Sequence, residues 1–340
     1  MRTPLSEVGE FGFIDRINRL MISRPEGIIQ GIGDDASVFE PPSGSVLLIT
    51  TDLLVEGVHF LVESTSLRLL GRKSLAVNLS DMAAMGAEPL DAYVSLAVPE
   101  KLSLEDLEEL YEGLREMAWE HRVNILGGDT TRSGGPLVIN VALTGCSPKE
   151  QVVFRSGAGP GDFIYVTGTL GDAGAGLDLL LRGGGWPNEK SRFLLEAHLN
   201  PKPQVLEGRF LAGRGFPTSM MDLSDGLASD LRRICERSGV GALVMEEAIP
   251  LSDALRQYAL EFGLNPLSLA LGGGEDYCLL LTVPAQRGPE VERAFEGEFG
   301  KPIWRIGKIT AEPQMLFLSR EGRSLPLPKG GWDAFSCPQR

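Results

Sequence analysis

The sequence predicts two layered domains that mix helices with strands, of the α+β and α/β classes. The chain has 340 residues, enough for two domains that each bury a core of their own. Short apolar runs typical of strands alternate with helix-like periodicity in both halves. The pattern restarts around Ser147-Pro148, so we expect an N-terminal domain over 1–147 and a C-terminal domain over 148–340.

The first half carries four strand-like runs and two helix-like segments. Strands are expected at 46–50, 92–98, 123–126 and 137–144, where short apolar runs are bounded by polar residues or glycine. Residues 66–85 have apolar side chains near helical spacing. A second helix is expected from Ser103, because Asp106 resembles the other half of a capping box and an apolar stripe follows. The glycine-rich stretch between the last two strands is expected to be a loop.

The second half follows a glycine-rich segment, 155–161, that is typical of a connector between domains. Strands are expected at 163–166, 218–221, 240–244, 278–282, 303–306 and 315–318. Helices are expected at about 173–181, after a glycine-rich turn, and at about 227–237.

Composition argues against several classes of function. The chain has 46 acidic and 32 basic side chains and a formal net charge of -14, which argues against nucleic acid or an anionic membrane as its partner. Its four cysteines are widely spaced without a C-x-x-C pair, so neither a disulfide framework nor a zinc site is expected. No run approaches the ~18 apolar residues of a membrane span, and the N-terminus lacks an apolar signal segment. We therefore expect a cytoplasmic protein.

The acidic residues follow one pattern in both halves. Several come directly after an apolar run and beside Gly, Ser or Thr, where we expect a strand end or a turn to hold them. They are Asp34, Asp35, Asp52, Asp81, Asp129, Asp222, Asp225, Glu275 and Asp276. Carboxylates that converge at such ends form a hard-oxygen site suited to Mg²⁺ rather than to zinc or copper. The alternative is that Asp and Gly are simply common turn residues.

Such a site would bind phosphate only through metal. Two unit charges ~4 Å apart interact by about 4 kcal/mol at an effective dielectric constant near 20, so carboxylates repel phosphate strongly. Acid-lined sites that take polyphosphates therefore use bridging cations. If these acids converge, the implied ligand is Mg²⁺ together with a nucleotide polyphosphate.

Two common nucleotide-binding motifs are excluded by their context. The stretch GIGDDA at 31–36 fits G-x-G-x-x-A, but Pro41-Pro42 prevents the long helix that a Rossmann turn requires. The stretch GRKS at 71–74 lacks the earlier glycine of a P-loop. The glycines of GIGDDA are therefore expected to form a bend that delivers acidic side chains to metal.

A few single residues have two possible roles each. His59 is a candidate contact, with a purely structural role as the alternative, whereas His121 and His198 are expected to have no catalytic role. Arg155 could reach phosphate oxygens or be a surface charge of the connector. Tyr111 is expected to pack in or beside the core, although it could flank a base or ribose.

Six sequence blocks occur together in a fixed order. They are GIGDDA (31–36), TTDLLVEGVHF (50–60), NLSDMAAMGA (78–87), GGDTTR (127–132), DLSDGL (222–227) and GGGEDY (272–277), with GGWDAF (330–335) near the end. In combination they closely resemble the thiamine-monophosphate kinase family. The resemblance implies ATP-dependent phosphorylation of thiamine monophosphate to thiamine diphosphate. It also implies the two-domain aminoimidazole ribonucleotide synthetase-like fold, in which an N-terminal α+β domain forms a homodimer and a C-terminal α/β domain closes the active-site cleft.

Carried over by motif, the resemblance implies three groups of site residues. The Mg²⁺ ligands would be Asp35, Thr50, Thr51, Asp52, Asp81, Asp129, Asp222 and Asp225. The ATP contacts would be Tyr111, Gly128, Asp129, Arg155 and Ser224. The contacts to thiamine monophosphate would be His59, Glu275 and Trp332, whose indole could stack on a thiamine ring. Catalysis is expected to depend most on Asp52, Asp129, Arg155 and Asp225.

The implied mechanism is direct in-line transfer of the γ-phosphoryl group of ATP. The nucleophile is already an anionic phosphate oxygen, so no strong general base is required; several Mg²⁺ ions, aided by Arg155, would neutralise the two polyanions. Two alternatives are another ATP-dependent synthetase of the same superfamily and a non-catalytic metal- or nucleotide-binding protein. Release of ADP from ATP, Mg²⁺ and thiamine monophosphate would distinguish the last of these.

Overall fold

The computed structural model describes residues 21–30, 38–39, 42–183, 186, 188–328 and 331. The chain divides into two compact units. The first comprises Met1–Met82 and Ala87–Glu150, and the second comprises Ala83–Gly86 and Gln151–Arg340. Among the described residues, no helix is long and apolar enough to cross a membrane.

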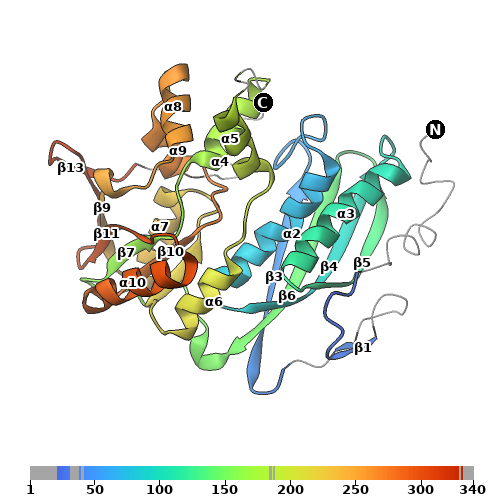
Figure 1. Cartoon of the computed structure of the whole chain (residues 1–340), viewed down its shortest axis with the longest axis horizontal. Helices are drawn as coiled ribbons and strands as arrows, with labels where there is room; N and C mark the ends of the chain where they lie inside the picture. Colours follow the sequence, from blue (N-terminus) through green and yellow to red (C-terminus); the bar gives the residue numbers. More distant parts are fainter. Residues whose placement is uncertain are drawn as a thin grey trace. The chain divides into compact units, whose positions relative to one another are not determined.

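The first unit is built on a four-stranded sheet with two helices on one face (Figure 1). Its strands are β3 (Ser45–Val55), β4 (Glu88–Pro99), β5 (Asn124–Ser133) and β6 (Val138–Pro148), in the order β3-β6-β4-β5. β6 is antiparallel to both its neighbours, and β4 and β5 are parallel. The helices are α2 (Leu67–Ala84) and α3 (Leu104–Glu120). A separate two-stranded sheet joins β1 (Ile28–Gln30) to β2 (Val38–Phe39).

The core of this unit lies between the sheet and the helices. Val94 and Val141 are register partners, as are Leu96 and Ile139, and all four are buried. Since side chains alternate between the two faces of a strand, this row identifies the face that the helices cover. The opposite face exposes Leu47, Ile49 and Leu53 of β3.

Glycines let the two helices of the first unit pack closely. A Cβ atom at Gly71 of α2 would overlap the carbonyl oxygen of Leu110, and one at Gly113 of α3 would overlap that of Arg68. The start of α3 confirms the expected capping box: the N–H of Asp106 donates to Ser103 Oγ at 3.3 Å, and Asp106 Oδ2 accepts from the N–H of Ser103 at 2.8 Å.

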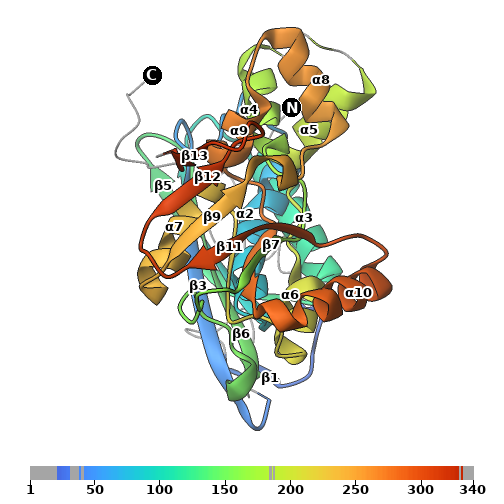
Figure 2. The same ribbon diagram turned by 90° about the vertical axis from the view of Figure 1, so that its left-hand side faces the viewer.

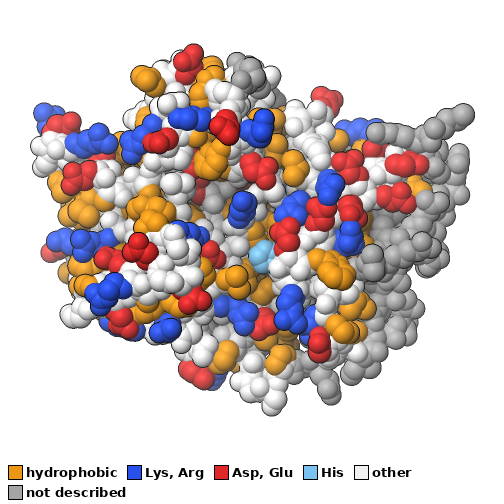
Figure 3. All heavy atoms as spheres, in the orientation of Figure 1, with side chains coloured by type: hydrophobic (Ala, Val, Ile, Leu, Met, Phe, Trp, Pro, Cys, Tyr) orange, Lys and Arg blue, Asp and Glu red, His pale blue; other side chains and the backbone are white. Residues whose placement is uncertain are grey.

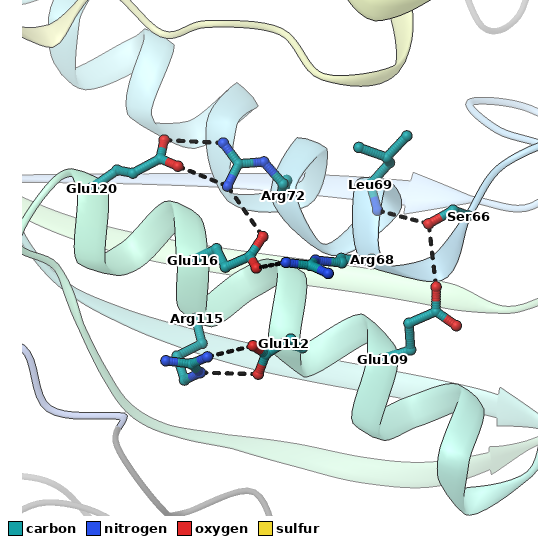
Figure 4. A network of polar contacts seen from close by, with 9 residues as sticks. All are labelled: Ser66, Arg68, Leu69, Arg72, Glu109, Glu112, Arg115, Glu116 and Glu120. Atoms are coloured by element: carbon teal, nitrogen blue, oxygen red, sulfur yellow. Dashed lines mark hydrogen bonds and ion pairs between the residues drawn. The ribbon is translucent and has the colours of Figure 1, made fainter.

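Ion pairs join the outer faces of α2 and α3 (Figure 4). Arg68 pairs with Glu116, and Arg72 lies 2.9 Å from Glu120 and 3.4 Å from Glu116. Acidic and basic side chains are interspersed over these helices on the face drawn in Figure 3. The Arg68 side chain is 54% exposed and that of Arg72 is 14% exposed. A surface pair such as Arg68–Glu116 contributes little, so the packing beneath the pairs does most to hold the two helices together.

The second unit contains a seven-stranded mixed sheet in the order β13-β12-β9-β11-β7-β10-β8. Its strands are β7 (Phe163–Val166), β8 (Ser219–Asp222), β9 (Gly241–Met245), β10 (Leu279–Val283), β11 (Trp304–Thr310), β12 (Met315–Leu318) and β13 (Ser324–Pro326). Only the pairing of β12 with β9 is parallel among these. Figure 2 shows β12, β9, β11 and β7 side by side.

Helices cover both faces of this sheet. The helices described in this unit are α4 (Asp172–Leu181), α5 (Glu189–Leu199), α6 (Val205–Gly213), α7 (Leu227–Ser238), α8 (Asp253–Phe262), α9 (Pro266–Gly272) and α10 (Gly288–Phe299). Leu231 and Ile234 of α7 share one buried cluster with Val166 and Met221 of the sheet. On the other face, the hydroxyl of Tyr165 donates to Glu292 of α10, which lies beside α6 (Figure 2). Helices α4, α5 and α8 form a smaller cluster of their own. Three short 3₁₀ turns, η1 (Lys149–Gln151), η2 (Glu246–Ala248) and η3 (Ala285–Arg287), complete the described elements.

Mixed helices and strands in both units confirm the predicted fold class. The expected strands and helices are present, but the loop expected between residues 126 and 137 is confirmed only at 134–136 and is wrong for 127–133. These residues continue β5, because Gly127–Ser133 pair in parallel with Tyr93–Pro99 of β4. Glycine disfavours strands in isolation, and here the neighbouring strand overrides that preference.

Candidate functional site

The first acidic group of the candidate site lies where β3 faces α2. Thr50 donates a hydrogen bond through Oγ1 to Oδ2 of Asp81, which projects from α2. Asp52 shares a register row with Val141, on the face that the helices cover. Its Oδ2 is buried and has no hydrogen-bond partner among the described residues. Burial, followed by the negative charge of Asp81, raises the pKa of Asp52 to about 7.

This pair of carboxylates has the chemistry of a cation site. An unpartnered buried carboxylate oxygen costs free energy, and a neighbouring carboxylate increases that cost. A divalent cation with a preference for oxygen ligands would remove both penalties. In the part of the chain that the structure describes, no group of three or more acidic, histidine or cysteine side chains is close enough to hold a metal. Asp35, the further ligand expected here, lies outside the described residues.

Two of the expected acids are inside strands rather than at strand ends, and Asp81 is inside a helix. Asp52 lies within β3 and Asp129 within β5, at opposite edges of the sheet. Three strand spacings of ~4.8 Å separate these edges by about 14 Å. Asp129 is also in the register row of Ser95, one row away from Asp52. Since Mg²⁺ binds oxygen at about 2.1 Å, one ion could not reach both aspartates of the same chain.

The second acidic group lies between β8 and α7. Asp222 is the last residue of β8 and is buried, as expected for an acid at a strand end. Ser224 and Asp225 follow it, just before the helix begins. Asp230, a fully buried residue of α7, accepts the backbone N–H groups of Asp225 and Gly226 at 3.1 Å each. This pair of hydrogen bonds fixes the loop that carries the candidate ligands.

Two neighbours of this loop were not expected from the sequence. Arg233 Nη2 lies 2.7 Å from Oδ2 of Asp225 and so neutralises part of its charge. Burial, and then the charge of Asp225, raises the pKa of Asp230 to about 7. An acid in the first turn of the helix expected at 227–237 was the available signal for Asp230. No comparable local signal exists for Arg233, whose position depends on the helix phase.

The glycine-rich loop at 272–277, before β10, packs against the loop at 223–226 that carries Ser224 and Asp225. The N–H of Glu275 donates to the carbonyl oxygen of Ser224 at 2.8 Å, and that of Tyr277 donates to Leu223 at 2.9 Å. The second unit therefore brings together predicted site residues from two sequence blocks: Asp222, Ser224 and Asp225 from DLSDGL, and Glu275 from GGGEDY. Nδ1 of His198, assigned no role from the sequence, lies 2.8 Å from Oε2 of Glu275.

Four other predicted site residues of the first unit have contacts that the structure defines. His59 accepts the N–H of Val55 at Nδ1, at 3.0 Å, which assigns the neutral ring the Nε2–H tautomer. Thr51 Oγ1 accepts from Asn140 Nδ2 at 2.8 Å. A Cβ atom at Gly128 would overlap the carbonyl oxygen of Val94, so glycine is needed there by the sheet itself. Tyr111 is buried, and its burial raises the pKa of its hydroxyl.

Arg155 lies on an exposed segment beside the edge strand of the second sheet. The carbonyl oxygen of the preceding residue, Phe154, accepts the N–H of Met220 at 3.0 Å. The guanidinium is therefore carried by backbone anchored to β8, which also bears Asp222. Trp332, the expected stacking residue, lies outside the described residues.

Comparison with known proteins identifies the family. The family model of the N-terminal domain of AIR synthase related protein matches residues 33–147, and that of the C-terminal domain matches residues 159–316. The chain is 40% identical over 337 residues to a thiamine-monophosphate kinase of Escherichia coli O157:H7, covering 97% of this chain and 99% of the relative.

Two solved structures agree with this assignment. The thiamine-monophosphate kinase of Stenotrophomonas maltophilia K279a has a TM-score of 0.82 and 36% identity, covering 94% of this chain and 98% of that one. AaThiL complexed with AMPPCP and TMP has a TM-score of 0.76 and 32% identity, covering 98% of each chain. The family expected from the six sequence blocks is thus confirmed, and the chain belongs to the thiamine-monophosphate kinase family, with the two domains of AIR synthase related proteins.

Proposed function

We propose that this protein transfers the γ-phosphoryl group of ATP to thiamine monophosphate, giving thiamine diphosphate and ADP in thiamine diphosphate biosynthesis. The full-length identity of 40% with a thiamine-monophosphate kinase carries the proposal. The similar AaThiL is complexed with AMPPCP, an analogue of ATP, and with TMP. ATP is therefore the co-substrate, and thiamine monophosphate is the phosphoryl acceptor.

The site residues of the proposal are those derived from the motifs. Mg²⁺ would be held by Asp35, Thr50, Thr51, Asp52, Asp81, Asp129, Asp222 and Asp225. ATP would contact Tyr111, Gly128, Asp129, Arg155 and Ser224, and thiamine monophosphate would contact His59, Glu275 and Trp332. The orphaned, buried Oδ2 of Asp52 beside Asp81 supports the metal assignment. The separation of Asp52 from Asp129 across the sheet favours several Mg²⁺ ions over one.

The side chains of this protein are needed for binding and alignment rather than for proton transfer. The attacking phosphate oxygen is already anionic, so no side chain has to remove a proton. When bound, Mg²⁺ supplies the positive charge that lets two polyanions approach in line. Arg155 would add charge from the connector, and the loop fixed by Asp230 would keep Ser224 and Asp225 aligned on the phosphates.

We also propose that the protein is a cytoplasmic homodimer and that residues 1–147 carry its dimer surface. Leu47, Ile49 and Leu53 alternate along β3 and expose large apolar side chains on the face without helices. Ile49 is 74% exposed. Large apolar side chains exposed on one face of a sheet are typical of a protein interface, which supports a second copy as their cover.

The decisive experiment mixes the purified protein with ATP, Mg²⁺ and thiamine monophosphate. Equimolar ADP and thiamine diphosphate are expected, with neither product formed when thiamine monophosphate or Mg²⁺ is omitted. ADP formation with an amidine precursor of aminoimidazole ribonucleotide, and not with thiamine monophosphate, would assign the protein to the synthetase alternative. Binding of ATP without any ADP would make it a non-catalytic binding protein.

A further inference from the structure

The backbone that carries Glu275 is held in an unfavourable conformation. Glu275 has a φ of 59° and Tyr277 a φ of 47°, both in the left-handed region that favours glycine. Such a conformation is unfavourable for a residue with a side chain. It persists because the N–H groups of Glu275 and Tyr277 are both bonded to the loop that contains Ser224. The Cα of Glu275 is therefore fixed beside the candidate ligands.

Asp276 fixes the same loop from its other side. This residue is half-buried, and both its carboxylate oxygens accept the N–H of Gly171, at 3.0 and 2.9 Å, at the start of α4. Burial raises the pKa of Asp276 well above its usual value. The loop is thus clamped to α4 on one side and to the Ser224 loop on the other.

The side chain of Glu275 is supported separately, by His198. The His198 side chain is 5% exposed and that of Glu275 is 26% exposed, and Nδ1 lies 2.8 Å from Oε2. This distance is that of an ion pair, and the contact falls outside hydrogen-bond geometry, so His198 supports Glu275 by charge and proximity. The buried His198 ring therefore contacts the Glu275 carboxylate, and part of the Glu275 side chain remains open to solvent.

The position of His198 depends on how closely α5 approaches α4. A Cβ atom at Gly176 of α4 would overlap the carbonyl oxygen of Leu194 and would lie 3.0 Å from Cβ of His198. Glycine at this position permits the close contact. Helix α4 thus organises both supports of Glu275, one through Asp276 and one through His198.

We propose that His198 is a positioning residue that fixes the direction of the Glu275 carboxylate toward the thiamine part of thiamine monophosphate. The proposal rests on the proposed function. Thiamine has a cationic thiazolium ring and an amino group on its pyrimidine, and both are complementary to a carboxylate, whereas the phosphates of ATP are not. Loss of His198 should therefore weaken use of thiamine monophosphate and leave use of ATP nearly unchanged.

The test compares His198→Ala and His198→Asn in the full-length protein, with His121→Ala as a histidine control. KM is measured for each substrate with the other saturating, because KM does not depend on the fraction of folded enzyme. His198→Ala should raise KM for thiamine monophosphate about tenfold and change KM for ATP less than twofold. His198→Asn should recover part of this loss, since the asparagine amide keeps a polar N–H group near the place of Nδ1.

A double-mutant cycle with Glu275→Ala separates positioning from general packing. In the Glu275→Ala background, His198→Ala should change KM for thiamine monophosphate less than twofold further. An equal effect in both backgrounds, a parallel rise in KM for ATP, or no effect of His198→Ala would overturn the proposal while leaving the kinase activity intact. If the unaltered protein formed no thiamine diphosphate at all, the proposed function would fail, and this role would fail with it.

Discussion

Asp52 has unfavourable electrostatics among the described residues of the first unit. Its pKa is raised to about 7 and its Oδ2 is buried without a partner among the described residues, so without metal its charge destabilises the fold. Asp52→Asn should keep the metal-free melting temperature at pH 8 the same or raise it. The same substitution should lower kcat at saturating Mg²⁺ on the order of 100-fold.

The rise in melting temperature on adding Mg²⁺ gives a readout besides activity. It should shrink in Asp52→Asn, because a ligand is lost. Asp253→Asn, at an exposed position in the first turn of α8, is the matched control and should keep both the Mg²⁺ response and turnover. Near-normal kcat and an unchanged Mg²⁺ response in Asp52→Asn would count against the metal assignment.

The raised pKa of Asp230 makes the stability of the second unit depend on pH. Its pKa is about 7 in the folded protein against 3.8 for the unfolded reference, so between these values the folded state binds more protons. The stabilisation that protonated Asp230 provides is therefore lost as pH rises from about 4 to about 7. Above pH 7 the ionisation of Asp230 no longer changes the stability with pH. Asp225 and Arg233 are the charged groups that face it.

Asp230→Asn should remove this pH dependence. The difference in unfolding free energy between the unaltered protein and the variant should fall by on the order of a few kcal/mol from pH 4 to pH 7. Urea denaturation without Mg²⁺ at four or five pH values measures it. A difference that is flat across this range, or that grows with pH, would show that Asp230 is ionised normally.

At the scale of elements, the close packing of α2 against α3 depends on glycine residues, which have no side chain at the contact. A Cβ at Gly113 would overlap the backbone of Arg68, so Gly113→Ala must push the helices apart. We expect a loss of about 1–3 kcal/mol of unfolding free energy. Gly297→Ala, in α10 with open space around it, is the matched control and should stabilise by about 0.5–1 kcal/mol. Equal effects of the two substitutions would mean that helix propensity, and not packing, controls Gly113.

Sequence reasoning identified elements where local signals and packing agree. Helix α3 was predictable because its capping box and apolar stripe point to the same start and the same buried face. β5 was predictable only in part, because its second half, Gly127–Ser133, has glycine and polar residues and becomes a strand only by pairing with β4. Strand order is likewise a property of pairing, and no spacing in the sequence indicates it.

The same limit applies to the candidate site. Asp222, Ser224 and Asp225 could be predicted as one group because they are neighbours in the sequence, whereas the approach of Glu275 to them depends on the packing of two loops. The separation of Asp52 from Asp129 was not predictable, because it follows from the order β3-β6-β4-β5. His198 and Arg233 reach the site through the phase of their helices, which a motif of consecutive residues does not record.

For the whole molecule, the exposed face of β3 connects stability to assembly. In one copy, Ile49 leaves 74% of its side chain in water, with Leu47 and Leu53 beside it on the same face. Burying such apolar area stabilises by about 25 cal/mol per Å², and a second copy would provide a matching face by symmetry. A homodimer with a self-complementary interface is therefore the expected assembly.

Ile49→Lys should convert that dimer to monomer, because each dimer would then bury two unpaired ammonium groups. The mass of one chain is 36.7 kDa. Sedimentation velocity should give a single species of twice that mass for the unaltered protein and a single species near that mass for the variant. Leu260→Lys, at an 85% exposed position of α8, is the matched control and should remain a dimer. A variant that stays dimeric while Leu260→Lys dissociates would place the interface on the second unit, and a monomeric unaltered protein would refute the dimer itself.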